Sequence, residues 1–199
     1  MSLRVTGGRF AGRRLNVPRG GLRPTADRVR ESLFARLGDL EGAAVLDLFA
    51  GTGSLGIEAL SRGAALLVSV ERARGAAAVL RANVAALSLK SSTRVMVADV
   101  AGALRRLGRA GERFDLVLVD PPYASGQAQP ALEALVEAEV LAAGAVVVLE
   151  RSRSHPSPSV VGLALLDERR YGDTVITRFT AAVPEAERSG TKAGGSPSA

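Results

Sequence analysis

The 199-residue sequence has no cysteine and no tryptophan, and it contains only one histidine and two methionines. Without cysteine the chain has no disulfide framework, no thiolate ligands for zinc or an iron–sulfur cluster, and no thiolate nucleophile. The last absence excludes cytosine C5 methylation, because that chemistry needs a thiolate. We also expect no bound metal.

Long apolar runs are missing too. No stretch approaches the roughly 18 consecutive apolar residues that a membrane-spanning helix needs, and the first ten residues, MSLRVTGGRF, lack the apolar core of a signal peptide. We therefore expect a cytoplasmic protein with no membrane partner. A length of 199 residues with 47% apolar content fits one domain with a single core, which we expect to be monomeric.

The net charge of +6 comes from one end of the chain. Residues 1–36 contain nine arginines and two acidic residues, which gives +7 there and leaves −1 for residues 37–199. A basic arm on a neutral body favours a polyanionic partner, most often nucleic acid, and arginine suits contacts with phosphates. The alternative interpretation is an arginine content set only by a GC-biased genome.

Apolar runs and helical patterns alternate along the rest of the chain. Strands are predicted at residues 43–49, 66–70, 94–97, 114–119 and 145–149, followed by a closing hairpin at 160–166 and 174–179. Helices are predicted at residues 25–37, 55–62, 72–87, 101–107 and 131–140. Strands that are apolar throughout are typical of parallel sheets covered on both faces. The predicted fold is α/β, with a doubly wound, mostly parallel seven-stranded sheet and an antiparallel strand at one end.

Composition divides the chain into three parts. Residues 1–38 are a basic extension, predicted as a small β-hairpin followed by a helix, and residues 39–183 are the sheet domain. Residues 184–199, PEAERSGTKAGGSPSA, are too rich in glycine, serine and proline to pack. We expect this last part to be a disordered tail.

A glycine-rich turn follows the first predicted strand. Gly51, Gly53 and Gly56 match the G-x-G-x-x-G pattern of a dinucleotide site. Glu71 lies 20 residues beyond Gly51, where its carboxylate could accept from ribose hydroxyls. Asp47, however, ends the strand next to the turn, where it would repel a pyrophosphate and attract a cation. S-adenosylmethionine (SAM) carries the same adenosine with a sulfonium and no phosphate, so we predict SAM and keep NAD as the alternative.

Further predicted strand ends add side chains at the same edge of the sheet. Asp99 follows the third sheet strand, where it could accept from the adenine amino group while Val100 lines the ring. Capping of the following helices is the alternative role of Asp47 and Asp99, and Glu71 could be an ordinary surface acid. The predicted cofactor-binding residues are Asp47, Phe49, Ala50, Gly51, Gly53, Glu71, Arg72, Asp99 and Val100.

The most specific pattern is Asp120-Pro121-Pro122-Tyr123, directly after the predicted strand 114–119. Two prolines remove two backbone donors and keep the segment extended. The Asp120 carboxylate and the Pro121 carbonyl could then hold the two hydrogens of one amine, while the Tyr123 ring stacks on a base. An amine held in this way aims its lone pair at a methyl donor. These four residues are the predicted catalytic segment; a Pro-Pro turn that merely ends a strand is the alternative.

This segment resembles the motif of class I methyltransferases that modify exocyclic amines. Within that superfamily, about residues 3–180 are similar to the RsmD-type 16S rRNA guanine-N2 methyltransferases. The similarity lies in RVTGG at 4–8, GRRL at 12–15 and above all RPTADRVRESLF at 23–34. It implies methylation of one guanine, position 966 in the standard 16S numbering, in the small ribosomal subunit or its assembly intermediate. The tail and the segment SRSHPSPS at 152–159 depart from the family pattern.

The resemblance also implies a role for the basic extension. Its arginines would hold RNA phosphates and place the target loop over Asp120. The predicted RNA-binding residues are Arg4, Arg9, Arg13, Arg14, Arg23, Arg28 and Arg30. Arg28 and Arg30 could instead pair with Asp27 or Glu31 on the same helix.

Three other functions stay open from the residues alone. The Asp120 segment does not separate guanine from adenine, so an adenine-N6 or other amine methyltransferase acting on DNA or RNA is the first alternative. An NAD-dependent oxidoreductase is the second and a non-catalytic RNA-binding module the third. His155, the single histidine, lies among serines and prolines and is predicted to be a solvated loop residue.

Overall fold

The computed structural model describes residues 3–17, 25–122 and 126–181. Within these ranges seven strands form one sheet in the order β3-β2-β1-β4-β5-β7-β6. Five strands are parallel: β1 (Ala44–Leu48), β2 (Leu66–Val70), β3 (Thr93–Met96), β4 (Phe114–Val119) and β5 (Leu141–Ser152). The sheet ends with β7 (Thr174–Ala181), antiparallel to both of its neighbours, and β6 (Leu163–Tyr171). The predicted α/β fold is confirmed.

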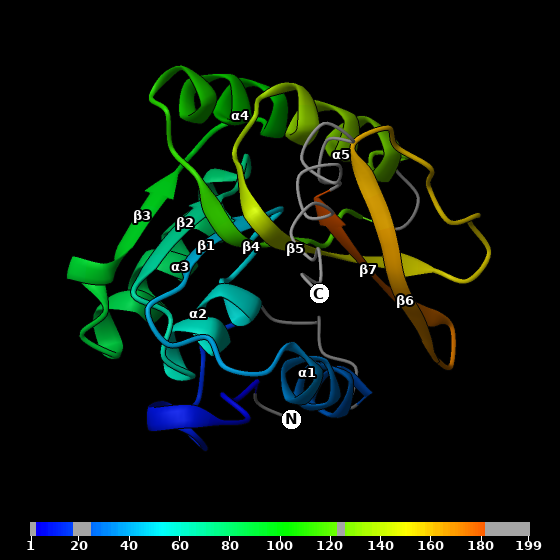
Figure 1. Cartoon of the computed structure of the whole chain (residues 1–199). Coiled ribbons are helices and arrows are strands. Elements are labelled where there is room, and N and C mark those ends of the chain that lie inside the picture. Colours follow the sequence, from blue (N-terminus) through cyan, green and yellow to red (C-terminus); the bar gives the residue numbers. More distant parts are fainter. Residues whose placement is uncertain (1–2, 18–24, 123–125, 182–199) are drawn as a thin grey trace, which may run out of the picture.

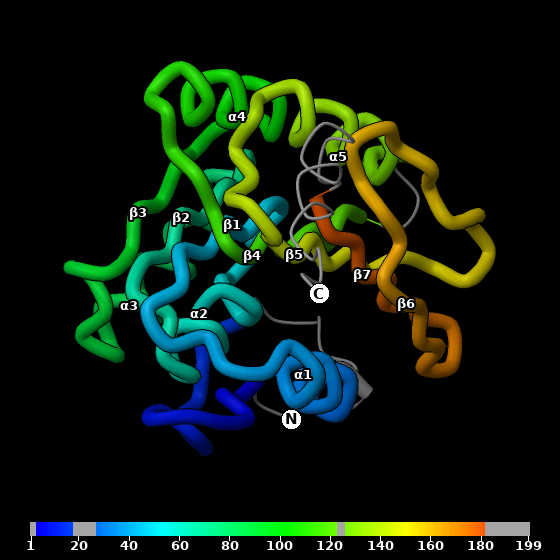
Figure 2. Tube along the Cα trace, viewed as in Figure 1, coloured from blue at the N-terminus to red at the C-terminus, as the bar shows by residue number. Residues whose placement is uncertain are grey.

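Helices cover both faces of the sheet (Figure 1). One face carries α1 (Thr25–Leu37), α2 (Ser54–Ser61) and α3 (Arg74–Ala86), and the other carries α4 (Val100–Arg109) and α5 (Ala128–Glu137). The Cα trace in Figure 2 shows the same two layers with the sheet between them. Two short 3-10 helices, η1 (Gly8–Phe10) and η2 (Lys90–Ser92), complete the described elements.

Strand β4 is apolar without interruption from Leu116 to Val119, and its burial shows why. Successive side chains of a strand point to opposite faces. Leu116 and Leu118 therefore enter the core under α1, α2 and α3, while Val117 and Val119 enter the core under α4 and α5. All four are at most 2% exposed. A strand buried on both sides has no solvent face to mark with polar residues.

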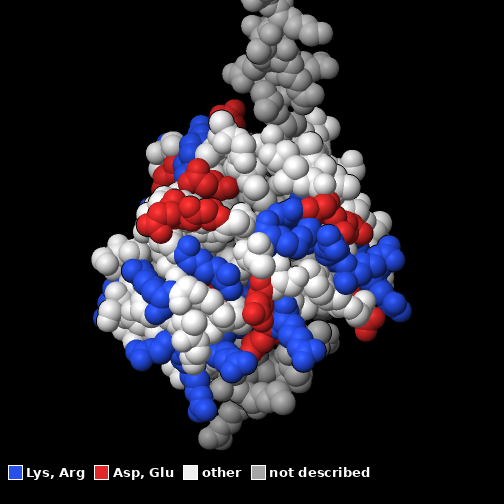
Figure 3. Space-filling view, turned by 60° about the horizontal axis from the view of Figure 1, so that its bottom comes forward, with Lys and Arg blue, Asp and Glu red and all other residues white. Residues whose placement is uncertain are grey.

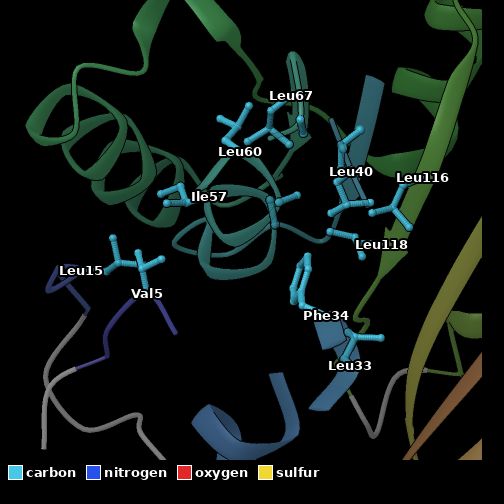
Figure 4. Packing of buried hydrophobic residues seen from close by; sticks show 14 of the residues in the cluster. Val5, Leu15, Leu33, Phe34, Leu40, Ile57, Leu60, Leu67, Leu116 and Leu118 are labelled. Carbon is cyan, nitrogen blue, oxygen red and sulfur yellow. The ribbon is translucent and has the colours of Figure 1, made fainter. Parts of the chain in front are cut away.

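The N-terminal arm packs against the sheet domain as a hairpin-like turn. Backbone hydrogen bonds join Leu15 N to the Leu3 carbonyl at 2.8 Å and Val5 N to the Arg13 carbonyl at 2.9 Å, and η1 lies between the two segments. Leu3, Val5 and Leu15 are buried in the same core as α2. Figure 4 shows Val5 and Leu15 on the side of Ile57, with α1 contributing from below. In place of the predicted small β-hairpin, the arm has a hairpin-like turn with one isolated β-bridge between Arg4 and Arg14, and its apolar residues attach it to the domain.

Helix α1 is joined to the last two strands by polar contacts. The Ser32 and Tyr171 hydroxyls are 2.7 Å apart, and the Arg36 guanidinium pairs with Asp167 of β6. Asp167 also pairs with Arg178 of β7, and hydrogen bonds from Arg178 and Arg36 lower the pKa of Asp167 to about 2. These contacts set the direction of α1 across the sheet.

The N-terminal turn of α1 points toward the edge where the parallel strands end. Thr174 at the start of β7 is paired with Ser152 at the end of β5, so the β6–β7 turn and Tyr171 lie at that edge. Ser32 contacts Tyr171, whereas Arg36, one helical turn later, contacts Asp167 further from the edge. The arginines at the start of α1 are therefore near the strand ends.

Several predicted boundaries differ from the structure. Strand β5 is longer than the predicted 145–149, and β6 covers Leu163–Tyr171 instead of 160–166. An edge strand with an exposed face can include charged residues, which hides it from an apolar pattern. The antiparallel strand is β7, second from the edge, and β6 is the edge strand. The predicted disordered tail at 184–199 lies outside the described residues, and none of the helices described is both long and apolar enough for a membrane span.

Candidate functional site

A cavity of about 280 Å³, the first cavity, lies beyond the ends of β1 to β4. Parallel strands end at a common edge, so residues far apart in sequence meet there. The predicted residues that line it are Phe49, Gly51, Glu71, Arg72, Asp99, Val100, Asp120 and Pro122. Val70, Ala98 and Gln127 complete the lining. The structure thus brings most of the predicted cofactor set to one place.

Two glycines of the β1–α2 turn are required by close packing. Gly53 has φ +87°, and a Cβ there would lie 2.9 Å from the Leu80 side chain. A Cβ at Gly56 would lie 2.7 Å from Leu67 and 2.9 Å from the Asp47 carboxylate. A side chain at Gly53, just before α2, would collide with Leu80 of α3, and one at Gly56, in the first turn of α2, would push α2 away from the sheet. The glycines therefore hold the turn close beneath the first cavity.

The N–H groups of the three predicted glycines already have partners inside the protein. The pairs are Gly51 with Glu71 Oε2 at 2.9 Å, Gly53 with the Ala50 carbonyl at 2.8 Å and Gly56 with Asp47 Oδ2 at 3.1 Å. A dinucleotide turn instead leaves such groups for a pyrophosphate. Two of the three here face carboxylates, which makes the turn a poor anion site. Ala50 itself is buried and contributes its carbonyl.

Glu71 and Asp99 are both oriented by backbone donors. Glu71 accepts from Gly51 N–H through one oxygen and from Ala73 N–H through the other at 2.7 Å. Asp99 accepts from Gly102 N–H at 2.7 Å and caps α4, as the alternative interpretation predicted. A carboxylate oxygen has two lone pairs, so one backbone bond leaves it able to accept from a ligand. Both residues keep their place in the lining of the first cavity.

Asp47 lies behind the glycine turn and does not line the first cavity. Its carboxylate is 1% exposed and accepts from Gly56 N–H. Burial raises the pKa of Asp47 to about 7, the Gly56 hydrogen bond partly offsets that effect, and the nearby Glu71 charge adds to it. The contact of Asp47 with a ligand stays a prediction; in the structure its carboxylate accepts from the first turn of α2, which is the helix-capping alternative.

The raised pKa of Asp47 predicts a pH-dependent stability. The ordinary value is 3.8 and the folded value about 7, so between these values the folded state holds a proton that the unfolded state has released. Stability should therefore fall as pH rises from about 4 to about 7. The isosteric Asp47→Asn variant keeps an acceptor for Gly56 and does not titrate. We expect the free energy of unfolding of the variant minus that of wild type to be larger at pH 8 than at pH 4, by at least about 1 kcal/mol.

Urea denaturation of both proteins across this pH range checks the prediction. A difference between Asp47→Asn and wild type that stays constant from pH 4 to pH 8 would show that Asp47 does not titrate as inferred. Asp173→Asn is a suitable control, because its side chain is 80% exposed. We expect that variant to follow wild type at every pH.

The Asp120 segment begins where β4 ends. Asp120 is half-buried, and its pKa is well above the usual range because of burial and the neighbouring charges of Glu150 and Asp47. Pro121 is buried, whereas Pro122 is exposed and lines the first cavity. Tyr123, the predicted stacking ring, lies outside the described residues. The described part of the segment forms a wall of the first cavity.

A second cavity of about 380 Å³ lies on the other side of this segment. Pro122 and Gln127 line both cavities, so the two spaces adjoin across the end of β4. The outer wall of the second cavity comes from segment 152–159, the part of the chain that departs from the family pattern. His155 is exposed there, as predicted, and also lines the cavity.

Arg151 holds that outer wall in place. Its side chain is 8% exposed, pairs with Glu168 at 2.6 Å and donates to the His155 carbonyl at 2.5 Å. Glu150, directly before it, also lines the second cavity and was missed by the sequence prediction. A usable signal was present, because Glu150 follows an apolar run as Glu71 and Asp120 do.

Most predicted RNA-binding arginines are on the surface. Arg4, Arg9, Arg13, Arg14 and Arg28 are exposed, and Arg23 lies outside the described residues. Figure 3 turns the end formed by the arm and α1 toward the viewer, and basic side chains are spread widely over this face, with fewer acidic ones between them. Arg4 also lies 3.6 Å from Asp27.

Arg30 is different, because its side chain is only 4% exposed. It pairs with Asp27 at 2.9 Å, lies 3.5 Å from Glu58 and donates to the Arg4 carbonyl. The predicted surface role of Arg30 is corrected by this burial, since a guanidinium surrounded by protein acceptors is not presented to a phosphate. The pairing with Asp27 that was kept as an alternative is present.

Two buried polar residues that the prediction missed connect the arm to the site. Glu58 accepts from the Thr6 N–H and the Thr6 hydroxyl, each at 2.7 Å. The amide of Asn83 donates to the carbonyls of Asn16 and Thr52, both at 3.0 Å. Thr52 belongs to the glycine turn, so the arm and the turn share one buried amide. The sequence did contain a signal for Glu58, which is the one charged residue in the otherwise mostly apolar helix segment SLGIEALS.

Comparisons with known proteins agree with this geometry. The family model described as Conserved hypothetical protein 95 matches residues 3–180. Ribosomal RNA small subunit methyltransferase D of Escherichia coli K12 is 38% identical over 160 residues, 79% of each chain. Its Haemophilus influenzae counterpart is 33% identical over 172 residues, 85% of this chain and 89% of that protein.

The solved structures lead to the same group. An E. coli structure named as a methyltransferase superposes with a TM-score of 0.82 at 31% identity, covering 92% of this chain and all of the other. The family match extends over nearly the whole described chain, and the identities to full-length relatives exceed 30%. The chain therefore belongs to the Conserved hypothetical protein 95 family, the RsmD-type methyltransferases of class I.

Proposed function

We propose that this protein transfers a methyl group from SAM to the N2 amine of a guanine in 16S rRNA of the small ribosomal subunit, position 966 in the standard numbering. The observation that carries the proposal is the pair of cavities that adjoin at Pro122 and Gln127, with Asp120 in the wall of the first. One is rimmed by carboxylates and suits a cationic nucleoside. The other opens on the opposite side of the same proline segment and suits the target base.

The electrostatics of the first cavity favour SAM over NAD. Asp47 and Asp120 both have raised pKa values, because burial and neighbouring carboxylates disfavour their charged forms. A cation in the cavity would relieve this repulsion, whereas a pyrophosphate would increase it. The glycine N–H groups that would hold a pyrophosphate are also already bonded, two of them to carboxylates.

The residues of the first cavity fit the parts of SAM. The oriented Glu71 carboxylate would hold the ribose hydroxyls, Asp99 the adenine amino group, and Phe49 and Val100 the faces of the ring. When bound, SAM supplies a methyl group on a sulfonium, which leaves as a neutral thioether. No residue of the chain is needed to activate that group.

The protein's own contribution is to hold the amine. The Asp120 carboxylate and the Pro121 carbonyl would accept the two N–H groups of guanine N2 and turn its lone pair toward the first cavity. The amine nitrogen gains the methyl carbon as the carbon–sulfur bond breaks, and it gives up one proton to water. A carboxylate in the surroundings of Asp120 is a stronger acceptor than an ordinary one, since its pKa is raised.

The basic extension supports RNA as the substrate. The exposed arginines Arg9, Arg13 and Arg14 are on the arm, and Arg28 is in the first turns of α1, whose start points toward the strand ends. Their charges would bind the phosphates on either side of a loop while its base enters the second cavity. The names of the relatives, which are small-subunit rRNA methyltransferases, agree with this substrate.

The test is methyl transfer to small subunits from a strain that lacks this protein. With labelled SAM, we expect the label on one nucleotide of 16S rRNA and N2-methylguanosine as the modified nucleoside after digestion. Subunits from the parent strain, already modified, should take up at least about tenfold less label. N6-methyladenosine as the product would overturn the base assignment. Calorimetric binding of NADH without binding of S-adenosylhomocysteine would overturn the cofactor.

A further inference from the structure

Asp120 and Glu150 lie at the same level of two neighbouring strands: Asp120 directly follows β4, and Glu150 lies near the end of β5, where it pairs with Ile176 of β7. Strands β4 and β5 are parallel, with Val119 opposite Leu149, so the next residue of each strand is one of these two acids. Both are half-buried, and the Glu150 charge is among the causes of the raised Asp120 pKa. Two carboxylates therefore face the space beyond the sheet edge, close enough to affect each other.

Glu150 is the acidic residue of the second cavity. Among the described residues that line this cavity, it is the one carboxylate, next to Pro121 and Pro122. The neighbouring cation, Arg151, is held by Glu168 and by the His155 carbonyl. The Glu150 side chain lies on the wall of the second cavity that a base would face while its amine reaches Asp120.

We propose that Glu150 selects guanine by accepting the N1–H of the target base while Asp120 holds the adjacent N2 amine. This inference rests on the proposed function, because it needs a base in the second cavity. It adds a specificity-determining residue and settles the choice between guanine and adenine that the Asp120 segment leaves open.

The selection follows from the hydrogen-bonding edges of the two bases. Guanine places the N1 donor directly beside its N2 amine, so a row of N–H groups faces the two carboxylates. Adenine has an amine next to N1 as well, but its N1 carries a lone pair. An ionised carboxylate can only accept, so Glu150 would repel adenine N1. A buried acceptor that faces a lone pair forms no hydrogen bond, so adenine would lose much of the binding free energy of one base contact.

A purely structural role for Glu150 predicts something else. If Glu150 acted only by tuning the charge of Asp120, its loss would change the rate on every base by the same factor. A change in preference between bases is therefore the decisive readout. The base analogue 2-aminopurine separates the two roles, because it keeps the C2 amine but has a lone pair at N1.

The experiment uses small subunits reconstituted with 16S rRNA that carries guanine or 2-aminopurine at the target position. For the wild-type protein we expect kcat/KM for guanine to exceed that for 2-aminopurine by at least about tenfold. In the Glu150→Gln variant the amide can accept from guanine N1–H or donate to 2-aminopurine N1. We expect the preference of this variant to shrink to less than about threefold, mainly through a gain on 2-aminopurine.

Two controls make the outcomes separable. Glu137→Gln makes the same chemical change on the exposed surface of α5 and should keep the wild-type preference. Calorimetry with S-adenosylhomocysteine and a thermal unfolding curve show whether Glu150→Gln is folded and loaded. An unchanged guanine preference in folded Glu150→Gln overturns the role of Glu150 and leaves the proposed function intact. No transfer by wild type to guanine overturns the proposed function and this inference with it.

Discussion

Replacing Asp120 by alanine should reduce methyl transfer to rRNA at least about 100-fold while SAM binding stays within about threefold of wild type. The carboxylate is expected to hold an N–H group of the target amine, and without it the lone pair is no longer aimed at the methyl donor. The fold should tolerate the change, because Asp120 is repelled by Glu150 and Asp47 and its charged form is disfavoured by burial. Single-turnover transfer and calorimetry with SAM measure the two effects separately.

The Asp120→Asn variant is the matched control, because an amide keeps one acceptor oxygen in the same place. We expect it to keep more activity than the alanine variant. Wild-type activity should also fall as the medium becomes acidic, since a raised pKa means that Asp120 takes up a proton at a higher pH than an ordinary carboxylate. The asparagine variant should lack that decrease. A fully active alanine variant would disprove the role given to the segment.

Replacing Glu58 by alanine should destabilise the protein by about 3–5 kcal/mol. Glu58 is 0% exposed and lies between two guanidiniums, 2.8 Å from Arg62 and 3.5 Å from Arg30. Arg30 is itself 4% exposed, so its charge would remain buried with Asp27 as its one remaining counter-charge among the described residues. The Thr6 N–H and hydroxyl would also lose their acceptor. Urea denaturation measures the change directly.

Two further variants test whether burial is the cause. Glu58→Gln keeps the acceptor oxygen and the volume, so we expect it to lose clearly less stability than the alanine variant. Glu112→Ala removes the partner of Arg94 in an exposed ion pair and should cost at most about 1 kcal/mol. Equal losses for Glu58→Ala and Glu112→Ala would contradict this account. Because Glu58 holds the arm, its alanine variant should also bind RNA more weakly.

Most residues of the candidate cofactor site could be grouped from the sequence because they sit in short segments that follow strands. Glu71, Asp99 and Asp120 each come directly after or close to an apolar run, and parallel strands must end at one edge. Asp47 follows the same pattern, yet the structure places it behind the turn. Its orientation depends on Gly56 and on the approach of α2, which no local pattern specifies.

The ends of the sheet were less predictable than its centre. The core strands β1, β2 and β4 are buried on both faces and are mostly apolar, with one polar residue in each, whereas β6 at the edge has exposed charged residues. Likewise, Arg30 and its exposed neighbour Arg28 are the same residue type on one helix. Which of them is buried depends on where Glu58 of α2 meets that helix.

The sequence alone was thus sufficient to predict the α/β class, the carboxylates near strand ends, the proline segment and the family. Apolar periodicity and short motifs are properties of neighbouring residues, so they can be recognised without the tertiary structure. Contacts between distant segments required the tertiary structure. These are the pairing of Glu58 with Arg30, the amide of Asn83 shared by the arm and the glycine turn, and the position of Glu150 beside Asp120. They depend on how helices and strands pack, since burial and charge pairing are decided only when surfaces far apart in the chain meet.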